Sequence, residues 1–396
     1  MKITVAAIDF GTSKIVTLVA ENGGNQRCDI IGAGVESYDG YQGGAWISPD
    51  SLKDAIASSV AKAQDQSHHK IREINVGVPG EFSRVYAVEA KVELQGTDPR
   101  VTPHDIELLF SRASEELSPL RGVIIHRSPA WFIVDDGKKT LEPVGMKGRE
   151  LRALVSFVVT DEYFISETRQ RMDELGIKVN GYFSVPTGEA MLFLPDEERD
   201  RTAVLIDMGY LSTDVMAVEG DAVVFHESIP MGGAYIALDV TYGLDIPLTM
   251  AEEIKRNYVY GLSGSNSEIE AVSSEGRNVS FPREKVAEVL EPRVDEIAEA
   301  IKKAIDESGV KLGNWSSVYL TGGGIGINRG GKDYLAAKLE RPVREVPKRT
   351  AKLNSPVFSS ALGLIDLVID TMENQSSASG GPFDGIADFF RSLFGN

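Results

Sequence analysis

The sequence predicts an α/β protein made of two similar lobes with small α+β inserts. The main observation is a repeated pattern of strand, aspartate-containing turn and strand, which occurs near the start of each half of the chain, at 3–20 and 203–218. The second is the composition, because 42% hydrophobic and 25% charged residues over 396 positions are typical of a globular protein with two or more cores. A motif that recurs half a chain length later favours a duplicated architecture over one continuous sheet.

The first hairpin opens the chain. Ile3 to Ile8 form an apolar run typical of a buried strand, residues 9–14 read Asp-Phe-Gly-Thr-Ser-Lys and form a tight turn, and residues 15–20 return as a second strand. The apolar run stops at Asp9 after too few residues for a signal peptide, and nowhere do 18 apolar residues follow one another. We therefore expect a chain that is neither exported nor membrane-spanning.

The first insert follows this hairpin. Thr102-Pro103 is a helix-start signal for a helix that extends to Leu117, and two extended segments follow at 122–134 and 151–159. Together they predict a small α+β unit.

The second hairpin has the strand 203–206, Asp207 and Gly209, then a polar turn and the strand-like run 215–218. Beyond it, residues 248–255 open a helix with Thr249 as a candidate cap. The Ser-, Gly- and Glu-rich stretch 261–276 predicts a loop, and 282–307 has apolar residues at helical spacing. A second insert is therefore expected here.

Charge and cysteine content exclude several classes of protein. A net charge of −18 is too acidic for a general nucleic-acid binder, which neutralises phosphates with a basic face, so we expect no nucleic-acid partner. A single cysteine, Cys28, allows no intramolecular disulfide and no cysteine-rich metal site. The low cysteine content fits a reducing compartment.

Both hairpin turns carry groups suited to a nucleotide triphosphate, which needs N–H and hydroxyl donors, close backbone approach and a divalent cation. In the first turn, Asp9 could hold Mg²⁺ through water, and Asp207 repeats it in the second. A third segment, the strand 318–320, ends in a threonine and three glycines, which lets a backbone lie flat against a base or ribose. The candidate phosphate and nucleoside residues are Gly11, Thr12, Ser13, Lys14, Gly209, Ser212, Thr213, Gly322, Gly323 and Gly324. Each segment alone is also compatible with an ordinary polar turn.

The order of these three segments resembles that of the actin-like ATPase superfamily, which includes actin, the 70-kDa heat-shock chaperones and sugar kinases. Further segments resemble the bacterial cell-division protein family FtsA: Asn-Val-Gly-Val-Pro-Gly at 75–80, Glu-Pro-Val-Gly-Met-Lys-Gly at 142–148, Ile-Pro-Met-Gly-Gly at 229–233, Ala-Glu-Glu-Ile-Lys at 251–255 and Glu-Pro-Arg at 291–293. The resemblance as a whole covers essentially all 396 residues. Pro-Val-Gly-Met-x-Gly is the most specific of these, because chaperones and sugar kinases have no counterpart of the insert that contains it.

The resemblance implies an actin-like fold, that is, a duplicated ribonuclease-H-like two-lobed α/β architecture with small α+β insert subdomains. The implied subdomains are IA (1–85 and 162–195), IC (86–161), IIA (196–240 and 313–371) and IIB (241–312), followed by a flexible linker (372–381) and an amphipathic tail (382–396). It also implies ATP and Mg²⁺ as cofactors, with Gly232 and Gly233 at the nucleotide and with Glu252 and Lys255 flanking the adenosine opposite the glycine triplet. Without the resemblance, Glu252 and Lys255 would be an exposed i,i+3 ion pair on a helix.

Two departures from the family pattern bear on hydrolysis. The family usually has Asp-Ile-Gly-Gly-Gly-Thr at the second turn, whereas Tyr210 and Leu211 replace two glycines here, so tight phosphate wrapping is in doubt. Related ATPases often carry a water-orienting Glu before a Pro, and the like position before Pro186 is Val185. We therefore assign no catalytic residue and expect at most a slow ATPase, with nucleotide acting mainly as an assembly switch.

The resemblance and the C-terminal sequence together predict the partners. The last 15 residues place six apolar side chains on or beside one helical face; they are Phe383, Ile386, Phe389, Phe390, Leu393 and Phe394. For an arbitrary terminus this pattern favours a terminal helix docked on the protein. The flexible linker before it and the resemblance to FtsA-like proteins, which end in a membrane-targeting segment, favour a membrane-targeting helix instead. Arg293, in the matching Glu-Pro-Arg, is the candidate contact for the acidic C-terminal tail of the tubulin-like division GTPase FtsZ. Its alternative is an ion pair within the chain.

The expected function is that of an ATP-binding, actin-like cell-division protein. It would assemble with itself into a filament, recruit later division proteins, and tether the FtsZ ring to the cytoplasmic face of the membrane at the division septum as a peripheral membrane protein. The alternative is a sugar kinase-like or pilus-assembly ATPase of the same superfold. A sugar kinase needs a catalytic Asp facing the sugar and has no use for a linker and an amphipathic helix.

Overall fold

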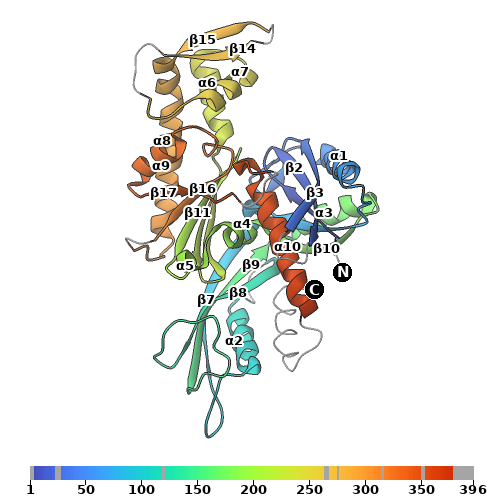
Figure 1. Cartoon of the computed structure of the whole chain (residues 1–396), viewed down its shortest axis with the longest axis vertical. Helices are drawn as coiled ribbons and strands as arrows, with labels where there is room; N and C mark the ends of the chain where they lie inside the picture. Colours follow the sequence, from blue (N-terminus) through green and yellow to red (C-terminus); the bar gives the residue numbers. More distant parts are fainter. Residues whose placement is uncertain are drawn as a thin grey trace. The chain divides into compact units, whose positions relative to one another are not determined.

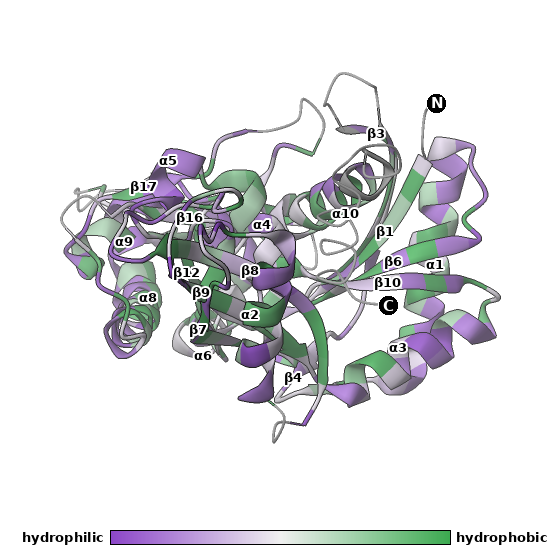
Figure 2. Ribbon diagram, turned by 90° about the horizontal axis from the view of Figure 1, so that it is seen from below, coloured by the Kyte–Doolittle hydropathy of each residue, from purple (hydrophilic) through white to green (hydrophobic). Residues whose placement is uncertain are grey.

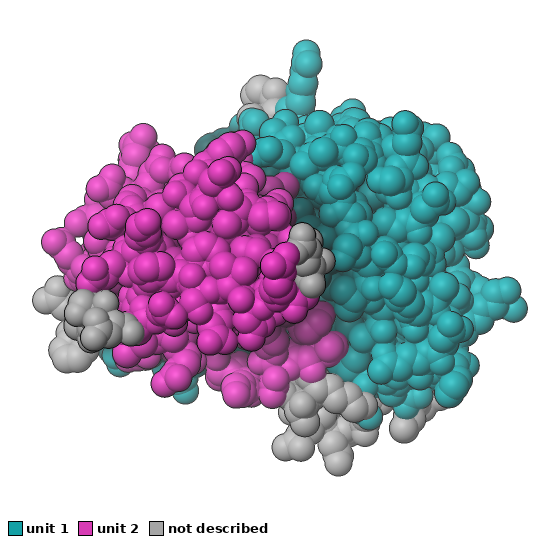
Figure 3. Space-filling model, turned by 90° about the horizontal axis from the view of Figure 1, so that it is seen from above, with its two compact units in different colours: residues 1–202, 216–226, 360–396 teal, residues 203–215, 227–359 magenta. Residues whose placement is uncertain are grey.

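The computed structural model describes residues 4–22, 28–117, 121–262, 267–273, 276–313, 316–348 and 353–377. The chain divides into two compact units (Figure 3). Unit 1 contains residues 1–202, 216–226 and 360–396, and unit 2 contains residues 203–215 and 227–359. Both units draw on segments that are far apart in the sequence.

Unit 1 is built on a five-stranded sheet with the order β10-β6-β1-β2-β3. Its strands are β1 (Thr4–Phe10), β2 (Lys14–Asn22), β3 (Cys28–Ser37), β6 (Glu73–Val78) and β10 (Lys178–Ser184), and short strands β4 (Tyr41–Gln42) and β5 (Ala45–Trp46) form a separate pair. β1, β2 and β3 pair antiparallel, whereas β6 and β10 join parallel to β1. The sequence prediction of a strand–turn–strand unit at the start of the chain is confirmed.

Helices cover both faces of this sheet (Figures 1 and 2). On one face, apolar strand residues such as Ile8 and Val76 share a core with α1 (Pro49–Ser67) and with Phe164 of α3 (Glu162–Glu174). On the other face, Gly77 lies against Val185 of α4 (Val185–Phe193) and Leu364 of α10 (Ser359–Ser377). The alternation along β6 therefore assigns each neighbouring residue to a different helical layer.

The insert that follows β6 and the short helix η1 (Gly80–Phe82) is an antiparallel three-stranded sheet with one helix. Its order is β7-β9-β8, with β7 (Ser83–Glu93), β8 (Val123–Val134) and β9 (Glu150–Thr160). The helix α2 (Pro103–Glu115) begins at a capping box between Thr102 and Asp105 and packs its apolar side on the sheet. The structure therefore confirms the α+β insert that the helix-start signal and the two extended segments predict.

Glu219 fixes the insert to the rest of unit 1. Its carboxylate accepts hydrogen bonds from Trp131 Nε1 of β8 at 3.1 Å and from the Thr202 hydroxyl at 2.9 Å, and it pairs with Lys139 Nζ at 3.2 Å. The next residue, Gly220, has a φ of 53°, and a Cβ there would lie 2.1 Å from the Ala130 carbonyl oxygen. This turn therefore contacts the insert in a way that only glycine allows.

The second five-stranded sheet has the order β13-β12-β11-β16-β17. Its strands are β11 (Ala203–Met208), β12 (Thr213–Glu219), β13 (Ala222–Ile229), β16 (Val318–Thr321) and β17 (Val343–Glu345). Three consecutive strands are followed by two that join parallel to the first, which is the arrangement of β1, β2, β3, β6 and β10. The duplicated architecture that the repeated hairpin predicts is therefore present.

The remaining elements of unit 2 build on this sheet. They are α6 (Gly233–Leu244), α7 (Leu248–Asn257), β14 (Glu268–Val272), β15 (Asn278–Pro282), α8 (Arg283–Glu307), α9 (Gly331–Leu339) and the short helix η2 (Pro356–Phe358), and the four-residue helix α5 (Asp196–Arg199) precedes the unit. Apolar residues of α6, α7, α8 and α9 share one core with strands β11 and β16. This core holds the loops of the candidate site in place.

Three sequence predictions are corrected by the structure. The stretch 261–276, which we predicted as a loop, contains β14, because Ile269 and Ala271 alternate with exposed glutamates and pair with β15. Thr249 does not cap α7, since the N-cap is Pro247. Helix α10 continues to Ser377, so the start of the predicted linker, 372–377, is helical. Extending an existing helix by a turn costs far less than starting one, which composition alone does not reveal.

The predicted subdomain boundaries also differ from the two units. Residues 196–202, 216–226 and 360–371, which we assigned to IIA, belong to unit 1. For α10 the physical reason is a contact with α4, in which a Cβ on Gly363 would lie 2.5 Å from the Glu189 nitrogen and one on Gly188 would lie 2.5 Å from the Gly363 carbonyl oxygen. The two glycines allow a helix contact that the sequence does not signal.

Candidate nucleotide site

The two predicted turns have the same hydrogen-bonded geometry. In the first, the Gly11 N–H donates to the Lys14 carbonyl at 3.0 Å, and in the second the Gly209 N–H donates to the Ser212 carbonyl at 2.9 Å. Each glycine lies two residues after an aspartate at the end of the first strand of its sheet, Asp9 in β1 and Asp207 in β11. The motif repeat therefore reflects a repeated backbone structure.

The first turn surrounds a buried carboxyl group. Asp9 is 5% exposed, and burial raises the pKa of its carboxyl to about 7, although the nearby Lys14 opposes this shift. Thr12 is also buried, while Ser13 and Lys14 are partly exposed. A buried carboxylate beside Lys14 fits the prediction of a cation ligand, because a divalent ion would offset the cost of its desolvation.

Two residues that sequence reasoning missed hold the first turn from outside. The Tyr38 hydroxyl donates to the Gly11 carbonyl at 2.7 Å, and the Tyr38 N–H donates to the Ser13 carbonyl at 3.3 Å. Gly40 has a φ of 80°, and a Cβ there would lie 2.1 Å from the Thr12 carbonyl oxygen. Burial and the Asp9 charge both raise the pKa of Tyr38 well above its usual value, so it stays a neutral donor. In the sequence, Tyr-Asp-Gly at 38–40 indicates a turn, but it does not indicate that this turn contacts residues 11–13.

Three loops of unit 2 converge at the second turn. The Gly324 N–H donates to the Met208 carbonyl at 2.7 Å, which joins the glycine triplet to the end of β11. The Gly233 N–H donates to the Gly209 carbonyl at 3.0 Å, which joins the N-terminal end of α6 to the second turn. The structure thus brings together all three glycine-containing segments of unit 2 that the sequence analysis singled out.

The glycines of these loops are required by contacts between backbones. Gly322 has a φ of 90°, and a Cβ on it would lie 2.2 Å from Asp207 Oδ1. A Cβ on Gly233 would lie 3.0 Å from the Gly324 Cα, and one on Gly324 would lie 2.8 Å from the Met208 carbonyl oxygen. Any side chain here would push the loops apart, so glycine is needed at these positions for the loops to pack this closely. Gly323 instead faces Val357.

Lys255 and Glu252 of α7 lie beside these glycine-containing loops as a buried ion pair, not as the exposed pair that their spacing in the sequence suggests. The Lys255 ammonium is 2.9 Å from a Glu252 carboxylate oxygen and donates to the Gly233 carbonyl at 2.9 Å. Only 3% of Lys255 is exposed, and this burial lowers the pKa of its ammonium while the Glu252 carboxylate opposes the shift. The pair therefore places two opposite, mutually compensating charges next to the first residues of α6, with the ammonium bonded to the Gly233 carbonyl.

Asn328 is a further site residue that sequence reasoning missed. Its side-chain amide donates to the Lys255 carbonyl at 2.7 Å and to the Tyr258 carbonyl at 2.9 Å, and so holds the C-terminal end of α7. Carbonyls at a helix end need such donors when they are buried. A lone Asn after a glycine-rich stretch gives no signal of this role in the sequence.

The predicted hydroxyl donors of the second turn are buried. Thr213 donates its hydroxyl to the Met231 carbonyl at 2.7 Å, which fastens the start of β12 to the segment before α6. Ser212 and Thr213 are both buried. The Thr213 hydroxyl proton is used within the protein in this structure.

Arg293, the predicted contact for a partner peptide, forms ion pairs within unit 2. Its Nε donates to Asp239 Oδ2 of α6 at 2.6 Å, and its Nη1 pairs with Glu296 one turn along α8. These bonds raise the pKa of the guanidinium, chiefly through Asp239. The intrachain pairing that the sequence left open is therefore present, and a partner carboxylate would have to compete with it.

The region of the missing water-orienting glutamate is hydrophobic. Val185 is buried against Gly77, and the nearest acid along α4, Glu189, is only 2% exposed. Among the described residues, no group of three or more His, Cys, Asp or Glu side chains is placed to bind a metal ion. A magnesium ion would therefore need oxygen ligands from phosphate and water in addition to the protein carboxylates.

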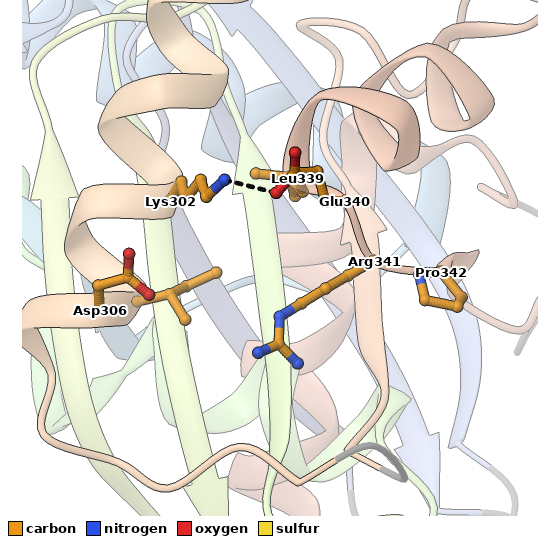
Figure 4. Close-up of a pocket in the computed structure, with 7 residues that line it drawn as sticks. Lys302, Asp306, Leu339, Glu340, Arg341 and Pro342 are labelled. Carbon is orange, nitrogen blue, oxygen red and sulfur yellow. Dashed lines mark hydrogen bonds and ion pairs between the residues drawn. The ribbon is translucent and has the colours of Figure 1, made fainter.

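A surface pocket of unit 2 contains none of the predicted residues. It has a volume of about 460 Å³ and lies between the end of α8 and the segment after α9 (Figure 4). The Lys302 ammonium pairs with Glu340 at 2.9 Å, and Arg341 and Asp306 also line it (Figure 4). Opposite charges in the pocket neutralise one another, so it offers no clear preference for an anion.

No helix within the described part of the chain is both long enough and apolar enough to cross a bilayer. The six apolar residues of the predicted membrane-targeting tail, Phe383 to Phe394, lie outside the described residues.

Comparison of the sequence with known proteins finds relatives along almost the whole chain. The family model described as Cell division protein FtsA matches residues 204–363, and that described as SHS2 domain inserted in FTSA matches residues 80–159, which contain β7, α2, β8 and nearly all of β9. The Cell division protein FtsA of Pseudomonas aeruginosa is 26% identical over 370 residues, which cover 91% of this chain and 88% of that protein. The Cell division protein FtsA of Bacillus subtilis is 23% identical over 363 residues, which cover 91% of this chain and 82% of that protein.

The fold is also found in solved structures of low sequence identity. A chain of the PilM-PilN type IV pilus biogenesis complex aligns with a TM-score of 0.63 at 17% identity over 92% of this chain and 98% of its own. MreB5 of Spiroplasma citri bound to AMPPNP aligns with a TM-score of 0.54 at 12% identity over 94% and 98%. These likenesses, with the two sheets of matching strand order, show the actin-like fold that the sequence predicts. Since its insert and its second half both match models of one family and its relatives span nine-tenths of its length, the chain belongs to the FtsA family of cell division proteins.

Proposed function

We propose that this protein is an ATP-binding, self-assembling division protein that tethers FtsZ to the inner face of the cytoplasmic membrane at the septum. The observation that carries the nucleotide part is the convergence of the second turn, the start of α6, the glycine triplet and the buried Lys255–Glu252 pair in unit 2. MreB5 of Spiroplasma citri, which has the same fold, is bound to the nucleotide AMPPNP in its solved structure, and this supports the same part.

The residues present fit a magnesium nucleotide. In unit 2, Lys255 offers an ammonium group beside the converging glycine loops. In unit 1, the Asp9 carboxyl, which is costly to bury in its charged form, would gain from a nearby dication. The nucleotide would supply its phosphate charge and the energy of a hydrolysable bond. Since Val185 provides no group to orient water, we expect slow turnover, with nucleotide binding rather than hydrolysis controlling assembly.

Calorimetric titration with Mg-ATP tests this part. The wild-type chain should bind, and Lys255→Gln should weaken binding by about tenfold or more, since it removes a buried charge next to the nucleotide. Lys285→Gln changes an exposed lysine of the same unit and should leave the affinity unchanged. Absence of any binding heat with the wild-type protein would overturn the proposal.

The FtsZ contact is proposed at Arg293 on α8. The acidic tail of such a GTPase would compete with Asp239 for the guanidinium, so the strength of the intrachain pair should control affinity. Arg293→Glu should abolish binding of an FtsZ tail peptide measured by fluorescence anisotropy. Asp239→Asn weakens the competitor and should tighten it. Unchanged affinity in both variants would place the peptide elsewhere.

The alternative functions of the same superfold gain less support. The likeness to the PilM-PilN complex shows the fold alone at 17% identity, whereas the matched insert at 80–159 is described as one inserted in FtsA. ATP turnover assayed with a panel of sugars separates the kinase alternative, because a sugar kinase should be stimulated by its sugar and this protein by none.

A further inference from the structure

The sheet of the insert carries two arginine side chains on the face that α2 covers in part. Strand pairing aligns Arg127 of β8 with Phe157 of β9, and it aligns Arg84 of β7 with Val159, two residues further along β9. Directly opposite residues point to the same face of a sheet, and so do residues two apart in one strand. Phe157 belongs to the core beneath α2, so both arginines lie on the α2 face. Ile124 of β8, which also pairs with Val159, is 39% exposed on this face.

A third arginine lies at the same end of the sheet. Arg121 is exposed and comes just before β8. A Cβ on the next residue, Gly122, would lie 2.6 Å from the carbonyl oxygen of Thr160, so the backbone here is held against the last residue of β9. We refer to Arg84, Arg121 and Arg127 as the arginine patch.

The arginine patch has no counter-charge within the described ranges, where no residue forms a hydrogen bond or an ion pair with any of its three guanidinium groups. Arg127 is partly buried, and this desolvation lowers the pKa of its guanidinium without a carboxylate that opposes the shift. By contrast, Arg171 and Arg293 form ion pairs within the chain. A partly buried charge without a partner is costly, and an anion from outside the chain would offset that cost.

The predicted tail gives a reason to expect a second contact with the membrane. Residues 382–396 contain two aspartates and one arginine, so the tail gains little from anionic lipid. One weak anchor becomes a stable attachment when a second signal, such as a basic patch, is added to it. With a net charge of −18, the protein as a whole is repelled by anionic headgroups, whereas the arginine patch is attracted to them. The arginine patch and the tail both belong to unit 1.

We propose that the arginine patch binds the phosphate groups of anionic lipids and so orients unit 1 on the membrane to which the tail attaches it. The proposal rests on the membrane function proposed above and deepens it. A guanidinium group binds phosphate oxygens through two parallel N–H donors, and the exposed Ile124 beside the arginines suits the apolar part of the headgroup region. Three arginines are too few to hold an acidic protein on lipid by themselves, so the arginine patch adds to the tail and does not replace it.

Sedimentation of the full chain with two kinds of vesicle tests this proposal. One kind contains equal parts of phosphatidylglycerol and phosphatidylcholine, and the other contains phosphatidylcholine alone. The wild-type protein should bind the anionic vesicles at least about fivefold more tightly, and added salt should reduce this preference. Arg84→Gln combined with Arg127→Gln should remove the preference and leave binding to phosphatidylcholine unchanged, because the tail is intact.

Two further double variants separate the arginine patch from net charge and from folding. Lys285→Gln with Lys311→Gln removes the same charge from exposed positions of unit 2 and should keep the preference. Arg84→Lys with Arg127→Lys keeps the positive charges and should retain most of it. A loss of the preference in the first of these variants, or its complete loss in the second, overturns the proposal.

The wild-type protein and the double glutamine variant distinguish failure of this proposal from failure of the proposed function. Equal binding of the wild-type protein to both kinds of vesicle overturns the lipid contact and leaves an acidic protein surface as the occupant of the arginine patch. An unchanged preference in Arg84→Gln with Arg127→Gln also overturns it, while attachment through the tail stands. Absence of wild-type binding to either kind of vesicle overturns the proposed membrane function itself.

Discussion

At the scale of single residues, Asp9 combines a cost to folding with a proposed role in binding. Its buried carboxyl has a pKa raised to about 7, so the charged form that a cation needs is disfavoured in the protein without ligand. Asp9→Asn keeps the shape and removes the charge, and should weaken Mg-ATP by about tenfold or more, or about 1.4 kcal/mol. Calorimetry measures this affinity.

The same variant has a control that involves no ligand. Without Mg-ATP, Asp9→Asn should be at least as resistant to thermal unfolding as the wild-type protein at pH 8, because a buried charge is removed. Weaker binding together with a less stable fold would point to a damaged turn and would contradict the assignment of Asp9 as a cation ligand.

His126 predicts how stability depends on pH. Burial lowers the pKa of its imidazole to about 4, so between pH 6.5 and 4 the unfolded chain binds a proton that the folded chain does not, and stability falls as the pH falls. Between pH 7.5 and 5.5, His126→Gln should lose about 1.4 kcal/mol less free energy of unfolding than the wild-type protein. Urea unfolding at both values checks this.

The control for this prediction is the exposed His104, whose side chain is 82% exposed. His104→Gln should follow the wild-type dependence. If the free energy of unfolding of His126→Gln depended on pH as that of the wild-type protein does, the imidazole would bind its proton in the folded chain as well.

The sequence predicts the residues of the candidate site better than it predicts how they are held. Asp-x-Gly turns and glycine triplets have a recognisable local pattern, and the structure places them where strands end. Tyr38 and Asn328 support the site through contacts between segments distant in the sequence, and no local pattern encodes such contacts. The burial of Lys255 likewise depends on α6, so spacing along α7 alone favours the wrong environment for it.

At the scale of elements, the α4–α10 contact determines where the C-terminal helix belongs. Gly363→Val would force a side chain to within 2.5 Å of the α4 backbone and should lower the free energy of unfolding by about 2–3 kcal/mol through overpacking. Ser360→Ala, a small change near the start of the same helix, is the control. Equal urea midpoints for both variants would show that the helices separate at little cost.

Element prediction from sequence succeeds where one pattern dominates. The capping box of α2 and the apolar spacing of α8 fix those helices within a few residues. It fails for β14, whose two buried residues are too few to outweigh Ser, Gly and Glu, and for the end of α10, which extends a helix stabilised by packing elsewhere.

At the scale of the whole molecule, self-assembly should control membrane attachment. A single amphipathic tail of about a dozen residues binds weakly, because ordering it opposes the burial of its apolar side chains. Assembly raises the local concentration of tails, so liposome binding should rise steeply with protein concentration. Sedimentation with liposomes measures this, and deletion from Pro382 onward should abolish it without changing ATP affinity. A truncated protein that still pellets with lipid would contradict the tail's role.

The two matching turns have a consequence for how this protein can be altered. Residues 9–14 and 207–212 share one turn hydrogen bond, from the glycine N–H to the carbonyl three residues later, yet they differ in every side chain except the aspartate and the glycine. One turn is thus a ready template for the other, and Thr-Ser-Lys could be transplanted in place of Tyr-Leu-Ser without designing a new loop. Comparing the exchanged turn with the original one would separate the contribution of the turn's backbone to nucleotide binding from the contribution of its side chains.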